Sequence, residues 1–201
     1  ALSKGLFYPV DFSSSGSSQI GGNVATNAGG IRVIRYGLTR NWVKGIKVIN
    51  GIGELMSFNE GLVKNASGYD LRHLIIGSEG TLGIITEVDI SLTKKPPPQR
   101  VILLGLNDPK ELIKTLEIFS RDIEISAFEF FSKLCMEKVS TSNEVVEPFS
   151  KTYEYYALIE FDESDVQKIE KAFEISIEKK LVEDGIISNS DKQFNQIWKL
   201  R

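Results

Sequence analysis

The sequence contains very little cysteine or histidine. Among its 201 residues there is one cysteine, Cys135, and one histidine, His73. A single cysteine excludes an intrachain disulfide, and a single histidine excludes a metal site built from several histidines of this chain, so we nominate no metal ligands. Cys135 stands between Leu134 and Met136 in an expected helix, and His73 stands beside Leu74. A packing or surface role is therefore the simpler interpretation of both residues.

The sequence also lacks an excess of basic residues and any long apolar run. Its formal net charge is -3 and its isoelectric point is near 5.4, which disfavours nucleic acid as a partner. Apolar runs such as residues 101–104 are far shorter than the roughly 20 residues that a membrane-spanning helix needs. Residues 1–10 lack the basic start and apolar stretch of a secretory signal. We therefore expect a cytoplasmic protein that acts on small molecules.

Glycine is distributed unevenly and divides the sequence into two parts. The first part is rich in glycine, whereas the second is rich in Glu, Lys, Ile and Phe. With 41% hydrophobic residues, the chain can form one or two domains with real cores. The run Lys94-Lys95-Pro96-Pro97-Pro98 lies between the parts, and consecutive prolines favour extended structure without sheet hydrogen bonds. We predict one partial domain over residues 1–95, a linker at 96–100 and a second partial domain over 101–201.

The first part predicts a mixed α+β unit. Residues 42–49 and 52–58 flank Asn50-Gly51, a pair suited to a two-residue hairpin turn. Residues 84–92 alternate, with Ile84 and Val88 expected on one face, as in a half-buried strand. A short helix is expected at 69–76. No strand is followed by G-x-G-x-x-G and a helix, so a Rossmann nucleotide site is not supported.

The second part predicts a ferredoxin-like domain. Asp108-Pro109 suits a helix start after the apolar strand at 101–106. The remaining pattern indicates strands near 124–131, 153–161 and 182–188, helices near 132–140 and 164–180, and a further helix at 191–201. Without the short helix at 132–140 the order is β-α-β-β-α-β, for which we expect an antiparallel sheet with helices on one face.

Two glycine-rich segments are candidates for binding a phosphate-bearing ligand. Residues 20–30 are nearly all small, so a ligand could approach the backbone and its N–H groups could surround an anion. Residues 77–83 lead directly into the expected strand at 84–92. No Lys or Arg occurs between Ser13 and Ile31, which argues against a P-loop. Composition leaves open the alternative that these glycines only form tight turns.

Several motifs resemble those of the FAD-linked oxidases of the vanillyl-alcohol oxidase type, which have a PCMH-type FAD-binding domain. Residues 17–30 (SSQIGGNVATNAGG) and 35–37 (RYG) carry the first match. Residues 64–71 (KNASGYDL) and 76–86 (IGSEGTLGIIT) resemble the branch that acts on D-lactate, glycolate and D-2-hydroxyglutarate. The likeness is strong over residues 8–95. Beyond residue 100 it is weaker and depends on 128–130 (FEF), 158–161 (LIEF) and 198–201 (WKLR).

The resemblance implies the second half of a PCMH-type FAD-binding domain, followed by part of a substrate domain. FAD would lie between two α+β subdomains, and the residues implied to contact it are Ser17, Ile20, Gly21, Gly22, Ala25, Thr26, Asn27, Glu79, Gly80, Gly83, Ile84 and Ile85. The implied reaction transfers a hydride from the Cα of a D-2-hydroxy acid to the flavin while a base removes the hydroxyl proton. The electron acceptor is not implied. In the motif that ends at Arg201, the family places an arginine near the substrate carboxylate, although a solvated charge remains the alternative.

The sequence also departs from the family pattern. The family's earlier glycine-rich pyrophosphate loop does not occur before Gly21, and its later histidine-containing metal segment does not occur either. We therefore expect a fragment that is inactive alone and from which FAD can be absent. Two alternatives remain: a non-catalytic flavin-binding or assembly subunit of a larger oxidase complex, and an oxidase of the same superfamily acting on alcohols or ether lipids.

Overall fold

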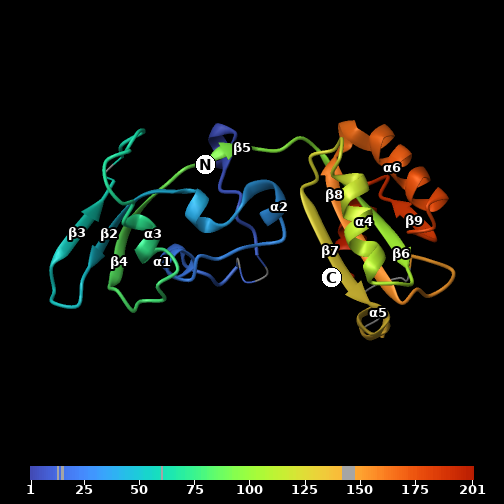
Figure 1. Cartoon of the computed structure of the whole chain (residues 1–201), viewed down its shortest axis with the longest axis horizontal. Coiled ribbons are helices and arrows are strands. Elements are labelled where there is room, and N and C mark those ends of the chain that lie inside the picture. The colour runs from blue at the N-terminus through green and yellow to red at the C-terminus, as the bar shows by residue number, and fades with distance from the viewer. Residues whose placement is uncertain (13, 15, 60, 142–147) are drawn as a thin grey trace. The chain divides into compact units, whose positions relative to one another are not determined.

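The computed structural model describes the chain except for residues 13, 15, 60 and 142–147. The chain divides into two compact units, Ala1–Lys95 and Pro96–Arg201. Both contain antiparallel sheets and helices (Figure 1), which confirms the predicted α+β class. No helix among the described residues is long and apolar enough to cross a membrane.

The first unit contains a three-stranded sheet with the order β3-β2-β4. Both neighbours of β2 pair with it in antiparallel fashion. A second, two-stranded pairing joins β1 to β5. The strands are β1 Leu6–Phe7, β2 Val43–Ile49, β3 Leu55–Phe58, β4 Ile84–Ile90 and β5 Thr93–Lys94. The helices are α1 Ile20–Ala25, α2 Val33–Tyr36 and α3 Arg72–Ile75, with 3-10 turns η1 Leu2–Lys4 and η2 Thr39–Asn41.

The core of this unit lies between one face of the three-stranded sheet and the helices α1 and α3. Val24 of α1 is fully buried and packs with Ile46 and Val48 of β2 and with Ile75 and Ile76. Burial of these branched side chains stabilises the sheet by about 1.5–3 kcal/mol for each. The core therefore fixes α1 against the sheet, next to the segment that follows α3.

The connection between β2 and β3 differs from the predicted Asn50-Gly51 turn. Ile49 pairs with Leu55, so residues 50–54 form a longer loop. The side-chain oxygen of Asn50 accepts hydrogen bonds from the backbone N–H of Ile52 (3.1 Å) and of Glu54 (2.9 Å). The positive φ of 86° falls at Gly53 instead of Gly51. Asparagine hydrogen-bonds readily to backbone groups just ahead of it, and that local preference defines a larger turn here.

A β-bulge in β4 overturns the simple alternation predicted for residues 84–92. Lys47 pairs with Glu87 and the next residue, Val48, pairs with Ile85, so Thr86 is the extra residue. A bulge shifts the face to which side chains point. Ile85 and Val88 consequently both face the core, whereas Ile84 is 70% exposed.

The second unit has a four-stranded sheet with the order β7-β8-β6-β9, antiparallel at every pairing. With α4 after β6 and α6 after β8, this is the predicted ferredoxin-like arrangement. Gln99 and Arg100, which fall in the predicted linker, are the first residues of β6. The strands are β6 Gln99–Leu106, β7 Ala127–Ser132, β8 Tyr155–Asp162 and β9 Asp184–Ile187. The helices are α4 Lys110–Phe119, α5 Lys133–Ser140, α6 Val166–Glu178 and α7 Asp191–Trp198, with the 3-10 turn η3 Glu163–Asp165.

Helices cover both faces of this sheet, not only one. Phe119 of α4 and Ile169 of α6 pack on the face that carries Ile102 and Ile159, and the two helices lie side by side (Figure 1). The opposite face has its own core, to which α5 contributes Met136. The C-terminal helix α7 and the turn after it also pack there. The expectation of one covered face is therefore incomplete, because β6 and β8 are apolar on both sides.

Candidate functional site

The first predicted ligand loop is largely a short helix that ends in a Schellman motif. The N–H of Ala28 donates to the carbonyl of Asn23 (2.8 Å), and the N–H of Asn27 donates to that of Val24 (3.1 Å). Asn27 has a positive φ of 49°, as this helix ending requires. These N–H groups satisfy the helix end, so they are not free to surround an anion as the sequence suggested.

The second predicted ligand loop lies directly against the end of α1. The N–H of Gly77 donates to the carbonyl of Val24 (3.1 Å), and the N–H of Glu79 donates to that of Ala25 (2.9 Å). Two segments about fifty residues apart in sequence, each predicted to contact one ligand, are thus hydrogen-bonded to each other. Their adjacency is the geometry that a shared cofactor site requires.

Arg40 connects the same two segments, and sequence reasoning missed it. Its backbone N–H donates to Oδ1 of Asn27 (3.0 Å), and its guanidinium Nη2 donates to the carbonyl of Ile76 (3.1 Å). The first bond reaches the first segment, and the second reaches Ile76, the residue immediately before the second segment. Arg40 stands outside any glycine-rich motif, so no local signal in the sequence could have indicated this role.

The glycines of these segments have different reasons for being glycine. A Cβ on Gly83 would lie 2.5 Å from the carbonyl oxygen of Ile49, and its φ is 152°, so only glycine fits there. Gly80 has a φ of 80° and also needs glycine, although its surroundings are open. Gly21 and Gly22 have no positive φ, and a Cβ on either would meet no atom within 4 Å. Nothing within the described chain explains these two, and the open space beside them leaves room for a closely approaching ligand.

The remaining residues that were predicted to contact a flavin differ in accessibility. Ser17 and Ile20 are exposed, as is Thr26, whose hydroxyl donates to the carbonyl of Gly22 (2.9 Å). Ile84 is exposed at the start of β4, whereas Ile85 packs against the core and offers little side-chain surface. The predicted contacts therefore separate into side chains that can reach a ligand and one that mainly stabilises the sheet.

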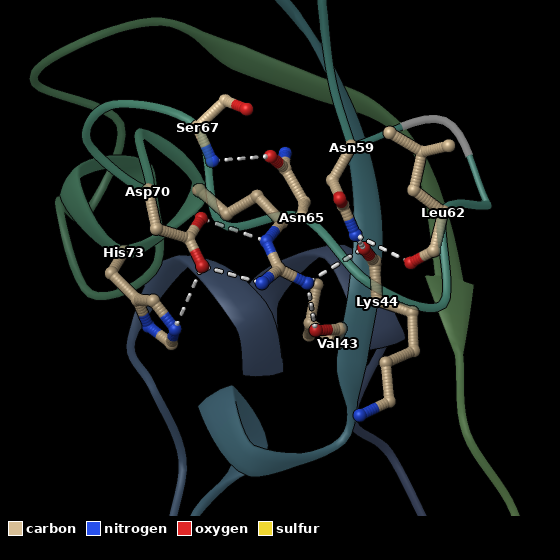
Figure 2. Close-up of polar contacts among 9 residues, drawn as sticks. Val43, Lys44, Asn59, Leu62, Asn65, Ser67, Asp70 and His73 are labelled. Atoms are coloured by element: carbon tan, nitrogen blue, oxygen red, sulfur yellow. Dashed lines mark hydrogen bonds and ion pairs between the residues drawn. The ribbon is translucent and has the colours of Figure 1, made fainter.

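A polar cluster around Arg72 fastens the segment before α3 to β2 (Figure 2). Arg72 donates to Asp70 from Nε (2.8 Å) and Nη2 (2.5 Å), and from Nη1 to the carbonyls of Val43 (3.1 Å) and Lys44 (2.7 Å). The hydrogen bonds from Arg72 hold the pKa of Asp70 below its usual value. His73 lies 3.5 Å from the same carboxylate. Because Arg72 already donates to both carboxylate oxygens of Asp70, we interpret this cluster as structural.

Arg201 lies in the second unit, beside an open hollow of about 610 Å³. Its Nε donates to Oε2 of Glu129 on β7 (2.7 Å). Lys138 of α5 lines the same hollow, together with the apolar side chains of Phe130 and Leu134. Two cations and one carboxylate thus border a partly apolar depression, which suits a small organic anion. Among the described residues, no group of His, Cys, Asp and Glu is placed to hold a metal ion.

Comparison with known families matches both units. Residues 1–59 match the FAD binding domain, and residues 95–201 match the C-terminal domain of FAD linked oxidases. The chain belongs to the FAD linked oxidases.

The chain is also similar to several curated proteins. The chain is 48% identical over its whole length to the D-2-hydroxyglutarate dehydrogenase of Stutzerimonas stutzeri and 50% identical to that of Xanthomonas citri pv. viticola. It is 38% identical to the mitochondrial D-2-hydroxyglutarate dehydrogenase of Arabidopsis thaliana over 98% of its length. The chain spans 44%, 43% and 37% of these relatives, respectively.

Solved structures support the fold. A structure of alkyldihydroxyacetonephosphate synthase is similar to this chain with a TM-score of 0.67 at 18% sequence identity. The match covers 96% of this chain and 38% of the synthase chain. At this identity the likeness concerns the fold alone. None of these comparisons supports the alternative of a non-catalytic assembly subunit.

Proposed function

We propose that the protein containing this chain oxidises a D-2-hydroxy acid with FAD, and that D-2-hydroxyglutarate is its substrate. The proposal rests on the hydrogen-bonded contact between α1 and the 77–83 segment. Both segments contain glycines whose backbone is open to a ligand, and the chain belongs to a family of FAD linked oxidases. The substrate follows from the names of the relatives that match the chain over its full length. D-Lactate and glycolate are the competing substrates.

The residues present fit an FAD molecule. The backbone at Gly21, Gly22 and Gly80 is open to a large planar or phosphate-bearing group, since an added Cβ at each would project into empty space. Thr26 and Glu79 are exposed beside these glycines. When bound, FAD supplies the acceptor for the hydride that leaves the substrate's Cα. The chain's own residues bind and orient the cofactor.

Arg201 is the group that we assign to the substrate carboxylate. It makes one ion pair among the described residues, through Nε, and this leaves the Nη groups to donate to a ligand. Planar guanidinium groups bind carboxylates with two parallel hydrogen bonds. Lys138 adds a second positive charge on the same hollow, which favours a substrate with two carboxylates over lactate or glycolate.

The test uses the full-length protein that contains this chain. It is purified with FAD and mixed anaerobically with D-2-hydroxyglutarate, D-lactate and glycolate in turn, and the flavin absorbance is followed. We expect D-2-hydroxyglutarate to bleach the flavin with the highest second-order rate constant for flavin reduction, while L-2-hydroxyglutarate serves as the stereochemical control. Equal rates for D-2-hydroxyglutarate, D-lactate and glycolate would contradict the substrate assignment, and absence of bleaching would contradict the proposed chemistry.

Two further expectations belong to this proposal. The electron acceptor is a second partner that reoxidises the flavin. The expected cytoplasmic location remains a prediction, because the names of the plant and animal relatives assign those proteins to mitochondria.

A further inference from the structure

Arg201 follows the last helix and has a long side chain whose position must be defined by its contacts. Its backbone N–H donates to the carbonyl of Trp198 (3.3 Å), and that of Leu200 donates to Ile197 (3.1 Å). The backbone turn is therefore anchored, and Leu200 is buried in the second core. The guanidinium, in contrast, is held by its hydrogen bond to Glu129. Without that contact the arginine side chain would sample many rotamers.

Glu129 occupies a position where a carboxylate does not help packing. It pairs with Leu158 on β8, and its neighbours at alternate positions on β7 are the buried Ala127 and Phe131. Side chains two residues apart on a strand share a face. Glu129 therefore projects from the face that carries the second core, with only 22% of its side chain exposed. An apolar side chain would suit this site better, because a half-buried charge costs stability unless it is paired.

The geometry of the pair preserves the binding end of the arginine. Glu129 accepts from Nε, on the flank of the guanidinium, with an N–O distance of 2.7 Å. A carboxylate that engaged both Nη groups would occupy the site needed by a ligand carboxylate. The flank contact instead restricts the guanidinium plane while leaving the far edge accessible, and 37% of the Arg201 side chain is exposed.

A second carboxylate on the same face anchors the helix that precedes this arginine. Glu160 of β8 is fully buried and accepts a hydrogen bond from the indole Nε1 of Trp198 (3.1 Å). Ala127 pairs with Glu160 in the sheet, so the two carboxylates come from adjacent strands. The end of α7 is thus attached to the sheet at Trp198 and at Arg201.

We propose that Glu129 is a positioning residue that orients Arg201 for the substrate carboxylate. This inference depends on the proposed role of Arg201 in substrate binding. Glu129 acts only through Arg201, because its oxygen is engaged on the flank of the guanidinium. Removing Glu129 allows the guanidinium to sample many rotamers. Substrate binding would then have to order the Arg201 side chain, and this entropy loss weakens the affinity for the substrate.

A double-mutant cycle in the full-length FAD enzyme tests this proposal. Glu129→Ala is expected to raise KM for D-2-hydroxyglutarate about tenfold while kcat changes by less than about threefold. In the Arg201→Ala background, Glu129→Ala is expected to have no further effect on KM, because the group through which it acts is gone. Lys168→Ala, which removes the ion pair of Lys168 with Asp165 at the start of α6, is the control and should leave KM unchanged.

Conservative variants separate positioning from a general effect of charge or folding. Glu129→Gln keeps the side-chain length and an acceptor oxygen for Nε of Arg201, so its KM should stay within about threefold of the parent value. Glu129→Asp shortens the side chain by one methylene, moves the carboxylate away from Arg201 and should raise KM. This order is informative even if Glu129→Ala fails to fold. The reverse order, or full additivity in the cycle, would overturn the role of Glu129. An unchanged KM in Arg201→Ala would instead overturn the proposed substrate role of Arg201 itself.

Discussion

At the scale of single residues, Gly21 and Gly22 are the most informative positions of α1. Glycine inside a helix costs roughly 0.5–1 kcal/mol relative to alanine, and neither a positive φ nor a close neighbour in the described chain requires it here. We infer that an external group needs the space that these two glycines leave open.

Gly22→Ala is therefore expected to separate stability from cofactor binding. The free energy of unfolding should stay constant or rise by up to about 1 kcal/mol, because alanine favours the helix. The affinity for FAD should fall by about tenfold, because the new methyl group occupies ligand space. Urea unfolding and a flavin fluorescence titration of the full-length protein measure these effects. Gly51→Ala, which also projects into open space, is the control and should alter neither.

Gly83 should behave in the opposite way. Its φ of 152° and the 2.5 Å approach of an added Cβ to the carbonyl of Ile49 make alanine incompatible with the present backbone. We expect Gly83→Ala to lower the free energy of unfolding by about 2 kcal/mol or more. Urea denaturation checks this expectation, and a variant as stable as the parent would show that the start of β4 readily adopts another path.

At the scale of elements, the Asp70–Arg72 pair links a long, exposed segment to β2 and makes its attachment pH-dependent. Arg72 lowers the pKa of Asp70 from the ordinary value of 3.8, chiefly through hydrogen bonds to the carboxylate. A carboxyl with a depressed pKa in the folded state contributes stability above its unfolded pKa. That contribution is lost as the pH falls through the lower folded value.

We accordingly expect Asp70→Asn to unfold more readily than the parent at neutral pH. The difference between the two should shrink as the pH falls below 3.8 and the parent carboxyl is protonated. Thermal unfolding followed by circular dichroism at several pH values provides the comparison. A difference that stays constant down to the most acidic pH would show that the charge of Asp70 does not stabilise this attachment.

At the scale of the whole molecule, the two units differ in how well they cover their apolar surface. Ile49 pairs with both Leu55 and Ile84, so these three side chains form a row across the outer face of the first unit's sheet. Leu55 and Ile84 are 64% and 70% exposed. The second unit instead has a core on each face of its sheet.

We therefore expect residues 96–201, expressed alone, to unfold cooperatively at a higher urea concentration than residues 1–95. The first unit should also bind a hydrophobic dye more strongly, because its apolar row is uncovered. Each unit has one tryptophan, Trp42 and Trp198, so intrinsic fluorescence reports on each piece. A higher unfolding midpoint for residues 1–95 would contradict this expectation.

The sequence by itself determined the features that depend on local pattern. Strand and helix order in the second unit follows from alternating and helical periodicity, and the proposed domain boundary rests on the prolines after Lys95. The family followed from short motifs whose residues are adjacent in the chain. Such signals are readable because each depends on neighbours within a few residues.

Only the tertiary structure decided which surfaces meet. The bulge at Thr86 depends on pairing with β2, some forty residues away, and it determines that Ile85 is buried while Ile84 is exposed. The bond from Arg40 to Ile76 and the pairing of Arg201 with Glu129 likewise join distant positions. No local periodicity encodes such contacts, because the register of a sheet and the packing of a helix are determined by the free energy of the whole folded unit.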